Sequence, residues 1–233
     1  VKLLHAYGMT EATNPIWTVM GRGRPDSCGV ASEDYDIIIA DDHDRELPPG
    51  QVGEILIRPK NPYTLFSGYY GMPEETVRAF RNLWFHTGDL AYRDRDGYFY
   101  FVDRKKDAIR RRGENISSQE LERVVLSHPA VLEAAAIGVP SELSEEDVKV
   151  VVALKPGAEL GPAELLAFCE KRMPYYMVPR YVEFVESLPK TSTERVAKSE
   201  LRKLGVTPQT WDAEREGYRV KRWLTSDGGR ERR

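Results

Sequence analysis

The sequence predicts an α+β protein that consists of a β-rich first part and a small α+β domain. Runs of β-branched residues separated by turn signals fill the first hundred residues, and short helices and strands alternate after that. A chain of 233 residues, 41% of them hydrophobic, is long enough for one or two cores. We therefore expect a β-rich part over 1–103, a junction at 104–106, an α+β domain over 107–205 and a polar tail over 206–233.

Two pairs of strands are predicted in the first part. The stretch "YDIIIADDHDRELPPGQVGEILIRP" has two runs rich in Ile and Val around a Pro-Pro-Gly turn. The segments "HTGDLAY" and "YFYFVDR" flank "RDRDG", where Asp96 and Gly97 supply a tight turn. Between the two pairs, "PEETVRAF" predicts a helix.

The second part begins with a helix start. Ser117 followed by Glu120 is a capping-box pattern, and the helix is expected to end at His128 and Pro129. The segments that follow predict strand, strand, helix, strand and helix in turn: "AVLEAAAIGVP", "DVKVVVALKPG", "PAELLAFCEKRM", "YVEFVESLP" and "KSELRKL". From Val206 the periodicity is lost, although Trp211 can still pack, and we expect "SDGGRERR" to be disordered.

Charge and composition exclude several classes of protein. A net charge of -3 gives the whole molecule no reason to seek nucleic acid or an anionic membrane. The sequence has no apolar run of the roughly 20 residues that a membrane-spanning helix needs. Cys28 and Cys169 lie far apart and suggest neither a metal site nor a redox pair, so we expect a reduced, cytoplasmic protein.

Two polar motifs in the first part suit a nucleotide. In "YGMTEAT", residues 7–13, an aromatic ring, a glycine, a hydroxyl and a carboxylate suit a flat base, a phosphate and a hard cation. In "HTGDLAY", Asp89 follows Thr87 and Gly88 at an expected turn, where it suits two sugar hydroxyls. The alternatives are a plain loop at a strand edge for the first motif and an Asp that caps a turn for the second.

Basic residues gather in "DRKKDAIRRRGENISSQELE", residues 103–122. Three explanations stay open for them. A nucleic-acid surface would need interleaved aromatic residues, which 104–115 lacks. A solvated surface suits Lys105 and Arg111, and a hinge beside an anionic ligand suits the position at a domain junction.

A last polar loop, "LPKTSTERVAKSEL", is expected to bring Lys190, Arg195 and Lys198 close together. The alternative is an ordinary loop whose cations face solvent.

Taken together, these motifs resemble the adenylate-forming superfamily of acyl-CoA synthetases, luciferases and adenylation domains. The resemblance covers about residues 1–204 and rests on "YGMTE", "GEILIRP" with "FSGYY", "WFHTGDL", "FVDRKKDAIRRRGENIS", "YMVP" and "LPKTSTERV", in the family's order. The stretch "FYFVDRKKDAIRRRGENISSQELE" is most similar to the carnitine and crotonobetaine CoA ligases. The resemblance implies the remainder of a large AMP-binding domain, a hinge at 104–106 and a small mobile domain. It also implies missing upstream parts, so we expect the chain alone to be inactive.

The resemblance implies a role for each site residue. Those expected at the nucleotide are Tyr7 on adenine with Gly8 beside it, Thr10 on phosphate, Glu11 on magnesium, and Asp89 and Arg104 on the ribose. Lys106 would be the hinge, Arg110 and Gly113 would line the path of CoA, and Arg195 would act in catalysis.

The implied activity is that of an AMP-forming carboxylate–CoA ligase, with ATP, Mg²⁺, CoA and a carboxylic acid as its partners. One departure stands out, because the family usually has Gly-Lys where this chain has Glu194-Arg195. An arginine keeps the charge but not the shape of a lysine. The alternatives are an impaired nucleotide- or CoA-binding module of the same fold and a nucleic-acid-binding domain.

Overall fold

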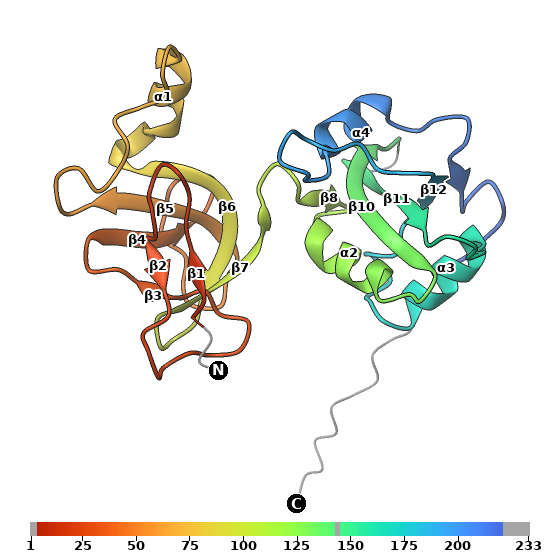
Figure 1. Ribbon diagram of the computed structural model, residues 1–233, viewed down its shortest axis with the longest axis horizontal. Helices are drawn as coiled ribbons and strands as arrows, with labels where there is room; N and C mark the ends of the chain where they lie inside the picture. The colour runs from red at the N-terminus through yellow and green to blue at the C-terminus, as the bar shows by residue number, and fades with distance from the viewer. Residues whose placement is uncertain (1–3, 143–144, 221–233) are drawn as a thin grey trace, which may run out of the picture. The chain divides into compact units, whose positions relative to one another are not determined.

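The computed structural model describes residues 4–142 and 145–220 (Figure 1). The chain divides into two compact units, Val1–Lys106 and Asp107–Arg233. The first unit is mostly β and the second combines a sheet with helices. The predicted α+β fold class is therefore confirmed.

The first unit is built on a seven-stranded sheet whose neighbouring strands are all antiparallel, in the order β1-β2-β3-β7-β6-β5-β4. The strands are β1 (Ala6–Tyr7), β2 (Ile16–Trp17), β3 (Gly29–Ala31), β4 (Tyr35–Ala40), β5 (Gly53–Pro59), β6 (Phe85–Arg93) and β7 (Tyr98–Arg104). Both predicted strand pairs are confirmed as β4–β5 and β6–β7. Gly97 has φ +87° in the β6–β7 turn, a value that favours glycine.

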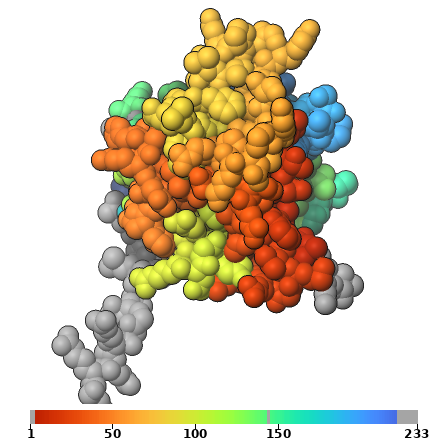
Figure 2. All heavy atoms as spheres, turned by 90° about the vertical axis from the view of Figure 1, so that its left-hand side faces the viewer, coloured from red at the N-terminus to blue at the C-terminus, as the bar shows by residue number. Residues whose placement is uncertain are grey.

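A helix stands apart from this sheet. Helix α1 (Pro73–Ala79) forms where "PEETVRAF" predicts it, with proline at its start and Glu74 and Glu75 in its first turn. The short 3₁₀ helix η1 (Arg81–Leu83) follows. Helix α1 has no buried residue, and it projects from the first unit in both views (Figures 1 and 2). The core of the unit lies instead along the strands, around Ile37, Ile57 and Phe85.

The second unit contains a four-stranded sheet in the order β10-β11-β12-β13, in which only the pairing of β11 with β12 is parallel. Its elements are the hairpin strands β8 (Ile109–Arg111) and β9 (Glu114–Ile116), then α2 (Ser118–Leu126), β10 (Val131–Pro140), β11 (Glu146–Leu154), α3 (Pro162–Glu170), β12 (Tyr181–Val185), α4 (Lys198–Leu204) and β13 (Trp211–Asp212). Every helix and strand predicted in this domain is present.

The two faces of this sheet have separate cores. Alternate strand residues such as Val150 and Val152 pack with Leu121 of α2 and Leu165 of α3. The intervening residues, Val151 among them, pack with Leu201 of α4 and Leu188. Helix α2 begins as its capping box predicts, because the Ser117 side chain accepts a 3.2 Å hydrogen bond from the Glu120 amide.

Two features of the second unit differ from the prediction. The β8–β9 hairpin was not expected, because each of its strands has only three residues. The two buried residues, Ile109 and Ile116, are too few among the charged residues to give a recognisable strand pattern. A polar tail was expected from residue 206, but Trp211–Asp212 form strand β13 and Ala213 is buried. The segment "SDGGRERR" lies outside the described residues. No helix within the described ranges is long and apolar enough to cross a membrane.

Candidate nucleotide and thioester site

A bulge in β6 presents Asp89. Leu56 pairs with His86 and Glu54 with Leu90, so Thr87, Gly88 and Asp89 all lie opposite Ile55 alone. Gly88 has φ +70°, and the Thr87 hydroxyl donates a 2.9 Å hydrogen bond to the carbonyl oxygen of Ile55. The prediction that Asp89 lies at a turn between strands is therefore wrong. It lies within one long strand, where the extra residues distort the ladder.

Asp89 joins two of the predicted nucleotide residues. The Tyr7 hydroxyl donates a 2.7 Å hydrogen bond to Asp89 Oδ2, and Arg104 Nε lies 3.6 Å from Asp89 Oδ1. Burial raises the pKa of Asp89, and burial together with the Asp89 carboxylate raises the pKa of Tyr7. Tyr7 is 9% exposed and its ring stacks with that of Phe101, so protein covers most of this residue.

The loop after β1 carries the other predicted residues of this motif. Glu11 Oε1 accepts a 2.9 Å hydrogen bond from the Tyr69 hydroxyl, and burial followed by this bond raises the pKa of Tyr69 to about 12. Thr10 is exposed. A side chain at position 8 would meet the carbonyl oxygen of Thr13 at 2.2 Å, so the close approach of two backbone segments requires Gly8.

An open hollow of about 490 Å³ collects several of these groups within the first unit. Its lining residues are Met9, Glu11, Thr87, Gly88, Asp89, Arg104, Lys105 and Lys106. The hollow thus combines two carboxylates with three cations, which suits a ligand that carries both phosphate and hydroxyl groups. Tyr7 does not line the hollow and is connected to it by its hydrogen bond to Asp89.

The fit of this site to magnesium can be judged from its carboxylates. Among the described residues, no group of three or more His, Cys, Asp or Glu side chains is arranged to hold a metal. Magnesium bound with a nucleotide needs only one or two carboxylates, because phosphates and water complete its shell. Glu11 in the hollow meets that requirement.

Lys105 and Glu54 form a support that the sequence interpretation missed. Lys105 Nζ lies 2.9 Å from Glu54 Oε2 and 3.0 Å from Asp42 Oδ1, and the Gly88 amide donates a 3.0 Å bond to Glu54 Oε1. Lys105 is exposed, as the solvated-surface interpretation has it, but it also forms two ion pairs that this interpretation did not include. Burial opposes the charged form of Glu54, but its bonds to Lys105 and Gly88 prevail and lower its pKa. Glu54 lies in "GEILIRP" and Tyr69 in "FSGYY". Their membership of these family motifs was the sequence signal that could have identified them as site residues.

The residues predicted to meet CoA lie on the β8–β9 hairpin of the second unit. Arg110 is exposed, and Gly113 has φ +80° in the turn, next to Arg112 with φ +53°. An added side chain at position 113 would meet no described atom within 4 Å, so the backbone conformation is what calls for glycine. Arg111, for which a solvated surface was one of the open interpretations, is buried and ion-paired with Asp147.

The three cations expected to lie close together in the loop before α4 have different partners. Lys190 pairs with Glu133, and Lys198 lies 2.7 Å from both Glu122 Oε1 and Ser118 Oγ. Arg195 is exposed, and no described residue forms an ion pair with it. Glu194 has φ +59°, the conformation that the glycine of the family pattern adopts without strain. The structure thus leaves Arg195 as the cation this loop presents.

The family follows from matches on both parts of the chain. Residues 1–70 match the family model "AMP-binding enzyme", and residues 120–195 match "AMP-binding enzyme C-terminal domain". Together with the fold described above, these matches show that the chain belongs to the adenylate-forming, AMP-binding enzymes. The chain spans about 40% of the length of the curated relatives it matches.

Among the proteins that this chain resembles are several CoA ligases. The chain is 38% identical over 208 residues to the crotonobetaine/carnitine–CoA ligase of Salmonella typhi, which covers 87% of this chain and 40% of that protein. ATP-bound MatB from Rhodopseudomonas palustris superposes with a TM-score of 0.75 at 33% identity, over 86% of this chain and 40% of that one. o-Succinylbenzoate CoA synthetase (MenE) from Bacillus subtilis, in complex with its acyl-adenylate OSB-AMP, gives 0.77 at 27% identity, over 86% and 41%.

Proposed function

We propose that the protein carrying this chain is an AMP-forming acyl-CoA ligase. The observation that carries the proposal is the constellation of Tyr7, Asp89 and Arg104 at the edge of a hollow that also holds Glu11. Tyr7, Asp89 and Arg104 come from three different motifs of the family pattern, and Glu11 comes from the same motif as Tyr7. Their meeting in one place supports a nucleotide site.

In this proposal the first unit binds the nucleotide. The carboxylate of Asp89 accepts hydrogen bonds from ribose hydroxyls, and Arg104 beside it carries a neighbouring donor. Gly8 allows the loop to pack closely, and Thr10 offers an exposed hydroxyl to a phosphate. Glu11 supplies one carboxylate oxygen to magnesium, which when bound neutralises charge on the phosphates of ATP.

Two half-reactions follow from this assignment. The substrate carboxylate attacks the α-phosphorus of ATP, an acyl-phosphate bond forms, and pyrophosphate leaves. Arg195, exposed on its loop, stabilises negative charge during this step. The CoA thiolate then attacks the acyl carbon and AMP leaves with the former carboxylate oxygen. Lys106, the last residue of the first unit, is the hinge between the two steps, and Arg110 and Gly113 meet CoA.

The substrate is a carboxylic acid, and the similarity to crotonobetaine/carnitine–CoA ligases favours a small or medium one. The test measures pyrophosphate release and acyl-CoA formation by the full-length protein with a panel of carboxylic acids. Product that depends on ATP, magnesium and CoA supports the ligase. Absence of pyrophosphate with every acid would contradict it.

A second candidate is a nucleotide- or CoA-binding module that no longer forms adenylates. The pair Glu194-Arg195 favours it, because the family pattern has Gly-Lys at these positions. Binding of AMP or CoA without pyrophosphate release would select this alternative.

A further inference from the structure

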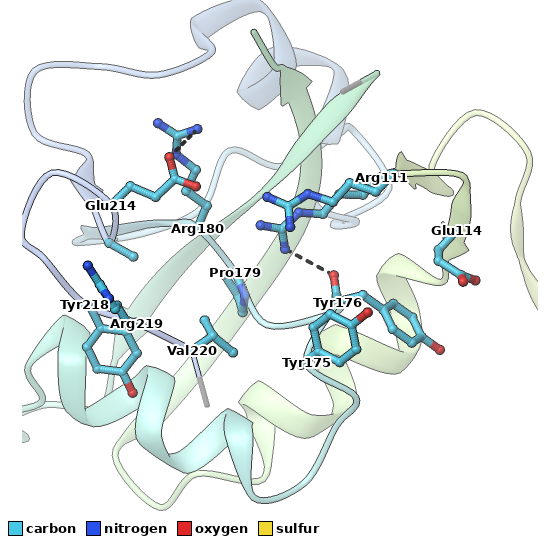
Figure 3. A pocket seen from close by; sticks show the side chains of 12 residues that line it. Arg111, Glu114, Tyr175, Tyr176, Pro179, Arg180, Glu214, Tyr218, Arg219 and Val220 are labelled. Carbon is cyan, nitrogen blue, oxygen red and sulfur yellow. Dashed lines mark hydrogen bonds and ion pairs between the residues drawn. The ribbon is translucent and has the colours of Figure 1, made fainter. Parts of the chain in front are cut away.

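Arg111 turns away from solvent and into the second unit. Its Nε lies 3.1 Å from Asp147 Oδ1, and its Nη1 donates hydrogen bonds to the carbonyl oxygens of Tyr176 (3.1 Å) and Val178 (2.8 Å). Figure 3 shows this side chain extending from the hairpin toward Tyr176. Burial lowers the pKa of Arg111. The charged guanidinium can therefore stay buried here only because these oxygen atoms accept its hydrogen bonds.

Asp147 is the centre of the arrangement. Its side chain is 3% exposed, and besides Arg111 it binds Arg180 Nη1 at 3.0 Å and the Ser141 hydroxyl at 2.8 Å. Arg180 in turn makes two 3.1 Å bonds to Asp212 on β13. One buried carboxylate thus joins the hairpin to the sheet and to the segment after α4. Loss of its charge would leave two guanidinium groups without that partner.

The backbone of the hairpin is also attached to β11, the strand that carries Asp147. The Arg110 amide donates a 3.0 Å hydrogen bond to Glu146 Oε2. The Glu146 carboxyl group occupies the space that a side chain at position 138 would fill, with contacts of 2.4–2.5 Å, so Gly138 makes room for it. Consecutive residues of β8 are therefore attached to consecutive residues of β11.

The turn of the hairpin is itself constrained. Arg112 and Gly113 both have positive φ, as in the two-residue turns that match the twist of a β-hairpin. A left-handed conformation is unfavourable for a residue with a side chain, so contacts elsewhere in the hairpin must offset its cost at Arg112. The bonds of Arg111, the preceding residue, are one such attachment, alongside the burial of Ile109 and Ile116.

We infer that Asp147 is a positioning residue for thioester formation: through Arg111 it holds the β8–β9 hairpin so that Arg110 and Gly113 keep the placement that CoA needs. This inference rests on the proposed function for the role of the hairpin. The anchoring itself rests on the contacts of Asp147 alone.

The test compares Asp147→Asn with Glu183→Gln in the full-length protein. Glu183 is a matched control, because it also accepts a hydrogen bond from a buried cation, Lys149 Nζ at 2.7 Å, and its other partners, Thr207 and Thr210, lie outside the hairpin. Three quantities are measured for each variant: hydrogen exchange of the amides of 109–116, pyrophosphate release, and transfer to CoA from preformed acyl-AMP.

For Asp147→Asn we expect faster exchange in the hairpin and a loss of about tenfold in transfer to CoA, the factor given by 1.36 kcal/mol, with pyrophosphate release little changed. Glu183→Gln should leave hairpin exchange and the ratio of the two rates as in the wild type. Equal hairpin exchange in wild type and Asp147→Asn, or equal losses in both half-reactions, would overturn the inference. A wild type that forms no acyl-CoA would contradict the proposed function, and hairpin exchange would then decide on Asp147 by itself.

Discussion

The Tyr7 hydroxyl lies 2.7 Å from Asp89 Oδ2, although 82 residues separate the two in the chain. The bond joins the loop after β1 to the bulge of β6, and each of these segments carries a motif that suits a nucleotide. Since Tyr7 holds one oxygen of Asp89, the other oxygen faces Arg104 and the hollow. Contacts within the first unit thus join three residues of the proposed nucleotide site.

Replacing Asp89 tests this organisation. We expect Asp89→Ala to weaken ATP and AMP binding, because the ribose loses a charged acceptor whose hydrogen bonds are worth about 1.5–3 kcal/mol each. Isothermal titration calorimetry on the full-length protein measures the change. The control is Asp36→Ala, which removes an exposed carboxylate paired with Arg58 on the same sheet. Unchanged nucleotide affinity in Asp89→Ala would remove Asp89 from the site.

The hinge assignment makes a different prediction. Lys106 is exposed in the turn that follows β7 and is the last residue of the first unit. Lys106→Pro fixes φ at this position and should suppress acyl-CoA formation by tenfold or more, a cost of about 1.4 kcal/mol, while adenylate formation stays largely intact. Rapid-quench measurement of each half-reaction separates the two effects.

Lys106→Ala serves as the control for the hinge, because it removes the side chain and leaves the backbone free to rotate. Equal losses in both half-reactions of Lys106→Pro would refute the hinge.

Arg195 tests the first half-reaction. Removal of one group that stabilises developing charge typically lowers kcat by about 10²–10³, and we expect a loss of this size in pyrophosphate release for Arg195→Ala. Lys190→Ala, in the same loop, removes a cation that is already paired with Glu133 and should have little effect. Similar activity in Arg195→Ala and wild type would show that this arginine does not take part in adenylation.

Glu54 gives the first unit a pH-dependent stability. Because its pKa is lowered in the folded protein, the stabilisation is present above the ordinary Glu value of about 4.3 and is lost as the pH falls through the lowered value. Urea unfolding at a series of pH values should therefore show a smaller loss of stability in acid for Glu54→Gln than for wild type. The difference between the two proteins isolates Glu54, since all other carboxyl groups are common to both. Parallel curves would contradict the role of its bonds to Lys105 and Gly88.

Local patterns were sufficient for most of the fold. The capping box at Ser117, the Asp96-Gly97 turn and the runs of Ile and Val act within a few residues of one another, so the sequence alone predicts their helices and strands. The β8–β9 hairpin and β13 could not be predicted in this way. Each of these strands has only two or three residues, and distant residues hold two of them: Asp147 binds Arg111 on β8, and Arg180 binds Asp212 on β13.

The sequence by itself determined the order of the motifs and, through their resemblance to a known family, the residues to examine. Only the tertiary structure decided which charges face solvent and which support the site. Lys105 and Arg111 look equally exposed in a basic stretch, yet one binds Glu54 and the other is buried against Asp147. The physical reason is that a partner of opposite charge holds each cation, and allows Arg111 to be buried, and those partners lie 51 and 36 residues away along the chain.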